Sequence, residues 1–207
     1  ILERYGMTET NMNTSNPHDG DRRPGTVGLP LPGIEVRVCD AAGQELPRGE
    51  TGVIEVRGPN VFRGYWGMPE KTKVELRPTG FFITGDMGVM GPDGYLTIVG
   101  RAKDLIISGG FNVYPKEVEE AIDALPGVVE SAVIGVPHPD FGEGVVALVV
   151  PKPDATLTPE GIIAAIAPGL ARFKQPKRVL IVPDLPRNTM GKVQKAELRK
   201  THSGLFV

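Results

Sequence analysis

The sequence lacks several features that would narrow its function at once. It has a single cysteine, Cys39, which excludes an internal disulfide, argues against a cysteine-based metal site and fits a reducing compartment. Its formal net charge is −2, so no excess of one sign indicates a general attraction to nucleic acid or membrane surfaces. No run of about 18 apolar residues occurs, so we expect no membrane span and a cytoplasmic protein.

Hydrophobic residues, in contrast, are plentiful. They make up 40% of the 207 residues, enough for the core of one large domain or two small ones. The 27 glycines and 20 prolines lie between apolar runs, a distribution typical of many turns rather than of disorder. Because the chain begins with Ile1 and opens directly on a motif-like stretch, we expect it to be a piece of a longer protein.

The first half has the pattern of short strands joined by turns. Apolar and polar residues alternate in "IEVRVCD" (34–40), "GVIEVRG" (52–58) and "GYLTIVG" (94–100), and turn sequences such as "GPDG" separate the strands. No convincing helix of more than two turns lies between them. The pattern predicts a small β-rich unit, either a barrel or a sandwich.

The second half mixes helix and strand signals. Residues 114–127 have Pro115 near a helix start, early acids and a Pro-Gly stop, and residues 158–170 have Thr158 as N-cap and Pro159 at the first helical position. Apolar strands flank both helices, so we expect roughly β-α-β-β-α-β. The change of pattern near 100–106 predicts a seam there. The fold class is therefore α+β, with a β-rich first half and a mixed second half.

Four polar clusters could carry chemistry, although each alone also fits a turn or a solvated surface. In "YGMTET" (5–10), Thr8 can donate to a phosphate oxygen and Glu9 can hold a hard cation such as Mg²⁺. In "TGD" (84–86), Asp86 can accept hydrogen bonds from a ribose diol. At the seam, Arg101 and Lys103 precede "SGG", whose glycines permit close approach of a ligand.

The fourth cluster is "PRNTMGK", in which Lys192 follows Gly191 in a turn before a short basic helix pattern. A lysine is a compact charge on a long stem, suited to reaching phosphate or carboxylate oxygens. The three histidines, at positions 18, 138 and 202, lack metal-ligand spacing, so we expect no histidine metal cage.

The order of these clusters along the chain is a much stronger signal than any one of them. "YGMTE", "TGD", "GRAKDLIISGG…YPKEVE", "FKQP" and "PRNTMGK" together resemble the C-terminal part of the adenylate-forming (ANL) superfamily, over essentially the whole chain. That superfamily includes acyl-CoA synthetases, peptide-synthetase adenylation domains and beetle luciferases. The stretch "ERYGMTETNMNTSNPHDGDRRPGTVG" also resembles malonyl-CoA synthetases.

The resemblance implies a domain plan and a role for each motif residue. Residues 1–102 would be the C-terminal, β-rich part of the large adenylation domain, and residues 103–207 a small mobile lid domain hinged at Lys103. ATP or AMP, Mg²⁺ and CoA would be the ligands. Lys192 would be the lysine required for adenylation, Thr8 would contact the α-phosphate, and Glu9 would bind Mg²⁺. Tyr5, with the adjacent Gly6, would pack against adenine, and Asp86 and Arg101 would contact the ribose. Ser108, Gly109 and Gly110 would line the pantetheine channel.

The implied activity is an acid–thiol ligase reaction in two steps. A small carboxylic acid, malonate or methylmalonate, would be activated as acyl-AMP, and the acyl group would pass to CoA. The superfamily's phosphate-binding loop lies upstream of "YGxTE" and does not occur in this sequence, so we expect residues 1–207 alone to be inactive. The alternatives are a fatty acyl-CoA synthetase, a peptide-synthetase adenylation domain, or a non-catalytic fragment that binds nucleotide.

Overall fold

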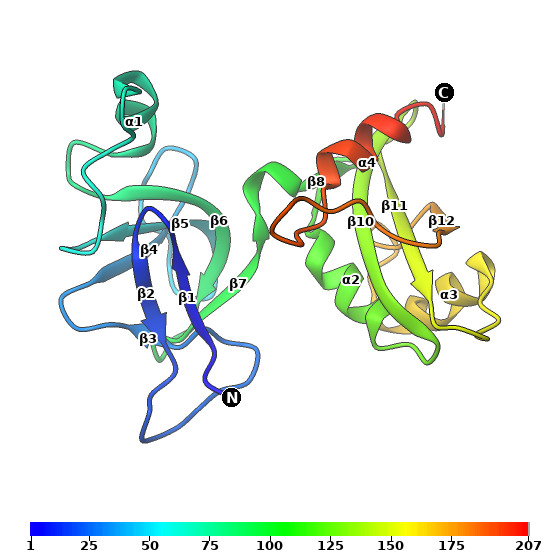
Figure 1. The fold of residues 1–207 in the computed structure, drawn as a ribbon, viewed down its shortest axis with the longest axis horizontal. Helices are drawn as coiled ribbons and strands as arrows, with labels where there is room; N and C mark the ends of the chain where they lie inside the picture. Colours follow the sequence, from blue (N-terminus) through cyan, green and yellow to red (C-terminus); the bar gives the residue numbers. More distant parts are fainter. Residues whose placement is uncertain (207) are drawn as a thin grey trace. The chain divides into compact units, whose positions relative to one another are not determined.

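The structure is a computed structural model that describes residues 1–206. The chain forms two compact units, one spanning Ile1–Ala102 and the other running from Lys103 onward. Both units are strand-rich, and the second adds helices to its sheet (Figure 1). The expected α+β class is confirmed by this content and by the solved structures that the chain matches. No helix in residues 1–206 is long and apolar enough to cross a membrane.

The first unit contains two antiparallel sheets and one short helix (Figure 1). The three-stranded sheet has the order β1-β2-β3, and the four-stranded sheet the order β4-β5-β6-β7. The elements are β1 (Arg4–Met7), β2 (Asn11–Ser15), β3 (Leu29–Pro30), β4 (Glu35–Cys39), β5 (Thr51–Arg57), α1 (Pro69–Glu75), β6 (Phe82–Met90) and β7 (Leu96–Arg101). No pairing joins β4 to β7 within the described chain, so the expected β-rich unit is present but its sheet is not closed into a barrel.

Alternation of apolar residues explains why the strands of the larger sheet form. Val38, Ile54, Val56 and Leu96 are buried in one cluster, and Tyr5 from the smaller sheet joins them. Each fully buried side chain of this size contributes about 1.5–3 kcal/mol relative to an exposed one. The β1–β2 hairpin that carries Tyr5 is thereby tied to the core of the unit.

A buried ion triad lies on the other side of the same sheet. The Glu55 side chain has no exposed surface, and its two carboxylate oxygens accept from the guanidinium groups of Arg37 at 2.7 Å and Arg77 at 2.6 Å. An ionised carboxylate at this depth needs such partners, because burial without them costs several kcal/mol.

The second unit is built on one five-stranded sheet. Its strands are ordered β10-β11-β8-β9, and β12 pairs with β11 in parallel. The elements are η1 (Ala102–Asp104), β8 (Ile106–Ser108), β9 (Phe111–Val113), α2 (Pro115–Asp123), β10 (Val128–His138), β11 (Gly142–Pro151), α3 (Pro159–Ile166), η2 (Ala167–Gly169), β12 (Arg178–Ile181) and α4 (Lys195–Thr201). The expected β-α-β-β-α-β order is present, with the β8–β9 hairpin and α4 added.

Both faces of this sheet are covered, as Figure 1 shows. Val133 and Ala147 face a core built with α2 and α3, whereas Ile134 and Leu148 face a second core that includes Leu198 of α4. Because successive residues of a strand point to opposite faces, a strand covered on both sides is a continuous apolar run. This is why β10 and β11 have no polar alternation.

The helix starts follow the local sequence signals. Thr158 caps α3, and its Oγ1 accepts from the Gly161 N–H at 3.1 Å, with Pro159 at the first turn as expected. Pro115 opens α2, and Val118 and Ile122 bury the apolar face of that helix. Both helices end earlier than expected: α2 stops at Asp123, and α3 gives way to the short helix η2 after Ile166.

Candidate active site

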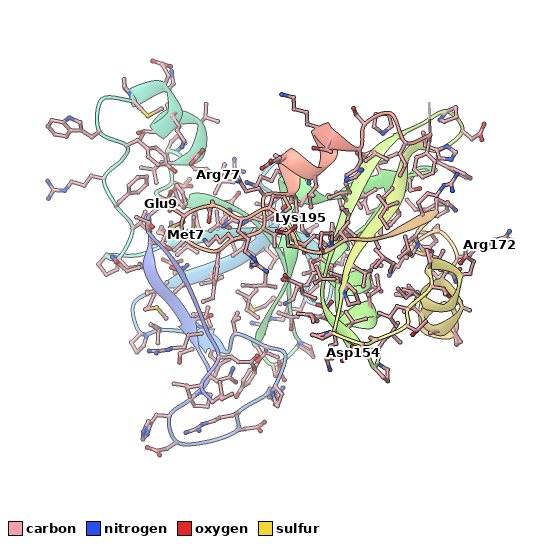
Figure 2. The ribbon with its side chains drawn as sticks, turned by 45° about the vertical axis from the view of Figure 1, so that its right-hand side comes forward. Met7, Glu9, Arg77, Asp154, Arg172 and Lys195 are labelled. Atoms are coloured by element: carbon pink, nitrogen blue, oxygen red, sulfur yellow. The ribbon has the colours of Figure 1, made fainter. Side chains whose placement is uncertain are left out.

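The β1–β2 hairpin carries the first predicted site residues in its turn. Thr8 is exposed there and Glu9 is half-buried, with Glu9 near the hairpin tip in Figure 2. Gly6 lies so close to the opposite strand that a Cβ would meet the Asn11 carbonyl oxygen at 2.1 Å. Glycine is therefore required at this position for the hairpin to close and present Thr8 and Glu9.

Tyr5, Asp86 and Arg101 come together inside the first unit. The Tyr5 hydroxyl donates to Asp86 Oδ2 at 2.6 Å, and Arg101 Nε donates to Asp86 Oδ1 at 2.7 Å. Antiparallel pairing of β6 and β7 sets Arg101 directly opposite Asp86. Burial, followed by the charge of Asp86, raises the pKa of the Tyr5 hydroxyl well above its ordinary value, so Tyr5 remains a neutral donor.

The Asp86 carboxylate keeps acceptor sites for the predicted sugar contact. A carboxylate offers about four lone-pair sites, so Asp86 can accept from a ribose diol while it holds Tyr5 and Arg101. Tyr5 itself is only 6% exposed and its hydroxyl is directed at Asp86. The predicted packing of Tyr5 against adenine, and the ribose roles of Asp86 and Arg101, remain predictions.

Glu9 has a partner that sequence reasoning did not identify. The Tyr65 hydroxyl lies 3.1 Å from Glu9 Oε1 and 2.6 Å from Glu75 Oε2. The Phe62 N–H also donates to the Glu9 carbonyl oxygen at 2.8 Å. Burial, then the hydrogen bonds to Glu75 and Glu9, raise the pKa of Tyr65 above its ordinary value. Glu9 and Tyr65 are 56 residues apart, so no local pattern could have predicted their contact.

The groups at Glu9 suit a Mg²⁺ ion shared with substrate phosphates better than a metal ion bound by protein ligands alone. Within residues 1–206, no three His, Cys, Asp or Glu side chains gather to hold a metal ion. Mg²⁺ in phosphoryl-transfer sites usually binds one or two carboxylates together with substrate phosphates and water. Glu9, beside the exposed Thr8 hydroxyl, is a carboxylate available for that arrangement.

Lys192 stands on a tightly closed turn of the second unit. Asn188 closes it, because its Oδ1 accepts from the N–H groups of Met190 at 3.0 Å and Lys192 at 2.9 Å, and its own N–H donates to the Lys192 carbonyl at 2.9 Å. Arg187 donates to the Gly191 carbonyl at 2.6 Å and pairs with Glu130 of β10. The backbone of Lys192 is thus fixed, while its side chain is exposed. Sequence reasoning identified this turn and Lys192 but not the role of Asn188.

Lys103 is exposed in η1, at the first position of the second unit. The next residue, Asp104, forms an ion pair with Arg199 of α4. This pair attaches the segment after Lys103 to the second unit. The hinge role of Lys103 remains a prediction.

The "SGG" loop borders a pocket of about 420 Å³ in the second unit. Ser108 is buried, and Gly109 and Gly110 have φ of 59° and 82°, the left-handed region that favours glycine. Three aromatic rings and two cationic side chains complete the lining: Phe111, Phe141, Phe173, Arg172 and Lys177.

The aromatic rings of this pocket make two close contacts. Phe111 stacks on Phe173 with ring centroids 4.6 Å apart, and Lys177 Nζ lies 4.6 Å from the centroid of Phe141. Arg172 extends away from the unit in Figure 2. Rings combined with cations suit a ligand that carries both a planar base and phosphates.

Comparison with known proteins identifies the family. The model of AMP-binding enzymes matches residues 1–66, and the model of the AMP-binding enzyme C-terminal domain matches residues 117–192. The long-chain-fatty-acid–CoA ligase of Yersinia pestis is 44% identical over 200 residues, which are 96% of this chain. The chain belongs to the AMP-binding, or adenylate-forming, enzyme superfamily.

Solved structures of this superfamily match the chain closely. ATP-bound MatB from Rhodopseudomonas palustris is 63% identical, covers all of this chain and gives a TM-score of 0.95. The amide bond synthetase McbA from Marinactinospora thermotolerans is 38% identical over 97% of the chain, with a TM-score of 0.88. The chain spans 35% of the length of the Yersinia ligase and 41% of that of MatB.

Proposed function

We propose that this chain is the C-terminal portion of an ATP-dependent carboxylate–CoA ligase. The observation that carries the proposal is the set of three groups that the fold presents: the Thr8–Glu9 turn, the Asp86–Arg101 pair and the braced Lys192. All three occur in a chain whose AMP-binding relatives are named as CoA ligases. The upstream part of the adenylation domain would supply the phosphate loop and most of the acid pocket.

In the first step a carboxylate oxygen of the acid attacks the α-phosphorus of ATP, and pyrophosphate leaves. Two anions must meet, so the main task of the protein is positioning and charge stabilisation. Asp86 and Arg101 would hold the ribose, Thr8 would donate to the α-phosphate, and Lys192 would bridge the carboxylate and phosphate oxygens. Mg²⁺ held by Glu9 would supply neutralisation of phosphate charge.

In the second step the thiolate of CoA attacks the acyl carbonyl carbon, and AMP leaves with the electron pair of the broken bond. Lys192 is not needed here, so we propose that the second unit turns about Lys103 between the two steps. The loop of Ser108, Gly109 and Gly110 would then line the pantetheine path. Its neighbouring pocket offers rings for the adenine of CoA and cations for the phosphates.

For the acid, we propose malonate or methylmalonate. The stretch 3–28 resembles malonyl-CoA synthetases, and the chain shares 63% identity with MatB but 44% with the Yersinia long-chain ligase. A long-chain fatty acid is the second candidate, favoured by the names of the curated relatives. The residues that choose between them would lie mostly in the acid pocket upstream of this chain.

The test uses the full-length protein and measures CoA-dependent AMP release with four acids in parallel: malonate, methylmalonate, acetate and a medium-chain fatty acid. We expect malonate or methylmalonate to give the highest kcat/KM. A preference for a monocarboxylate would leave the ligase proposal intact and overturn the substrate assignment. Absence of AMP release with every acid, while the protein binds ATP, would favour a non-catalytic nucleotide-binding role.

A further inference from the structure

The Tyr65 hydroxyl is fixed by the core of the first unit, independently of Glu9. Its ring packs edge-on against Phe62 with centroids 4.8 Å apart, and Phe62 packs in turn on the buried Phe82 at 5.4 Å. The Tyr65 N–H donates to Thr72 Oγ1 at 2.9 Å, and Lys71 Nζ lies 3.9 Å from the centroid of the ring. These contacts fix the position of the Tyr65 hydroxyl beside the hairpin turn.

One proton serves two carboxylates at this point. A tyrosine hydroxyl has a single hydrogen, so it donates fully to Glu9 or to Glu75 but not to both. Glu75 is the nearer acceptor, at 2.6 Å against 3.1 Å for Glu9. Within residues 1–206, the structure gives the Glu9 side chain no partner other than Tyr65. When the hydroxyl donates to Glu9, it holds Oε1 alone, and Oε2 is available to a cation.

We propose that Tyr65 is a positioning residue that orients the Glu9 carboxylate toward a divalent cation. The inference rests on the proposed function, because it takes Glu9 as the magnesium ligand. Carboxylates that bind metals are commonly oriented by a hydrogen-bonded outer partner, whose loss typically weakens metal binding about 10–100-fold. Tyr65 meets this description: it contacts Glu9 through the hydroxyl, and its ring is held by Phe62 and Lys71.

The experiment removes the hydroxyl and measures cation binding directly. In the full-length protein saturated with a non-hydrolysable ATP analogue, Mn²⁺ is titrated and the free ion is followed by electron paramagnetic resonance. We expect Tyr65→Phe to weaken Mn²⁺ binding about 10-fold. We also expect it to raise the Mg²⁺ concentration that half-saturates acyl-AMP formation by a similar factor, with little change in the KM for the acid.

Tyr95→Phe is the matched control. Tyr95 is another tyrosine of the first unit, more buried than Tyr65, and its hydroxyl donates at 2.6 Å to the Asp21 carbonyl rather than to a site residue. The same atom is thus deleted, and Mn²⁺ binding should not change. Equal weakening in Tyr95→Phe and Tyr65→Phe would mean a general loss of structure and would overturn the proposal.

Glu9→Gln separates this inference from the proposed function. If Glu9→Gln weakens Mn²⁺ binding while Tyr65→Phe stays within twofold of the wild type, Glu9 is a ligand and Tyr65 does not position it. If Glu9→Gln leaves Mn²⁺ binding unchanged, the magnesium role of Glu9 fails first, and the role of Tyr65 fails with it.

Discussion

Asn188→Ala tests whether the Lys192 turn must be closed for adenylation. The substitution removes the Oδ1 that accepts from the N–H groups of Met190 and Lys192. Each such hydrogen bond contributes about 0.5–1.5 kcal/mol net, and the turn is exposed, so the lower half of the range applies and the loss is about 1–2 kcal/mol. An energy of this size corresponds to a factor of about 5–30 in population.

The expected result is a slower first half-reaction, by up to about 30-fold, with the second unchanged. The assay follows pyrophosphate release in the absence of CoA, and separately thioester formation from presynthesised acyl-AMP, both in the full-length protein. Thr189→Ala is the control, because Thr189 lies in the same turn and the described residues give its side chain no hydrogen bond. Equal slowing of both half-reactions, or unchanged adenylation in Asn188→Ala, would refute the reasoning.

Four further predictions concern the first unit. Glu55→Gln should lower the free energy of unfolding by about 3 kcal/mol. This is the lower end of the range for a broken buried ion pair, because both arginine partners are partly exposed to water. The control is Glu35→Gln in an exposed ion pair, which should barely shift the denaturation midpoint. Gly6→Ala should slow adenylation by up to about 100-fold, because its Cβ meets a carbonyl oxygen across the hairpin at 2.1 Å. Burial raises the pKa of the Cys39 thiol to about 11, so Cys39 should react with a maleimide at pH 7 only in denaturant. Burial also raises the pKa of Tyr5, so the contribution of its hydroxyl to stability is present below pH 10.0 and is lost as the pH rises further. The urea midpoints at pH 8 and pH 10.5 should therefore differ less in Tyr5→Phe than in the wild type.

The sequence predicts best the elements whose signals are local. Thr158 and Pro159 predict the start of α3 because a cap acts over one helical turn, and alternation predicts β4 because its register has a period of two. It predicts β1 poorly, since "RYGM" is only four residues long and contains a glycine, and the strand depends on pairing with β2. Whether the sheet closes into a barrel could not be predicted, and in the described chain it stays open, because pairing between distant strands leaves no trace in either strand alone.

In the candidate site too, the sequence predicts local features but not contacts between distant residues. Motif order identifies Asp86 and Lys192, but the contact between Tyr5 and Asp86 joins residues 81 apart in the chain, and that between Tyr65 and Glu9 joins residues 56 apart. Contacts of this kind arise from packing of the two sheets and of the loop before α1. Only coordinates reveal which tyrosine accompanies which carboxylate.

The five-stranded sheet of the second unit has a mechanical consequence. The Lys192 turn is anchored to it through Arg187 on Glu130 of β10, and the loop of Ser108–Gly110 joins β8 and β9 of the same sheet. Because a close-packed sheet deforms little, a rotation of the second unit would move both loops together. In the proposed reaction cycle, Lys192 could not enter the active site without moving the loop of Ser108–Gly110 out of it. The rigidity of β10 and β11 would therefore keep the two half-reactions in separate orientations of the second unit.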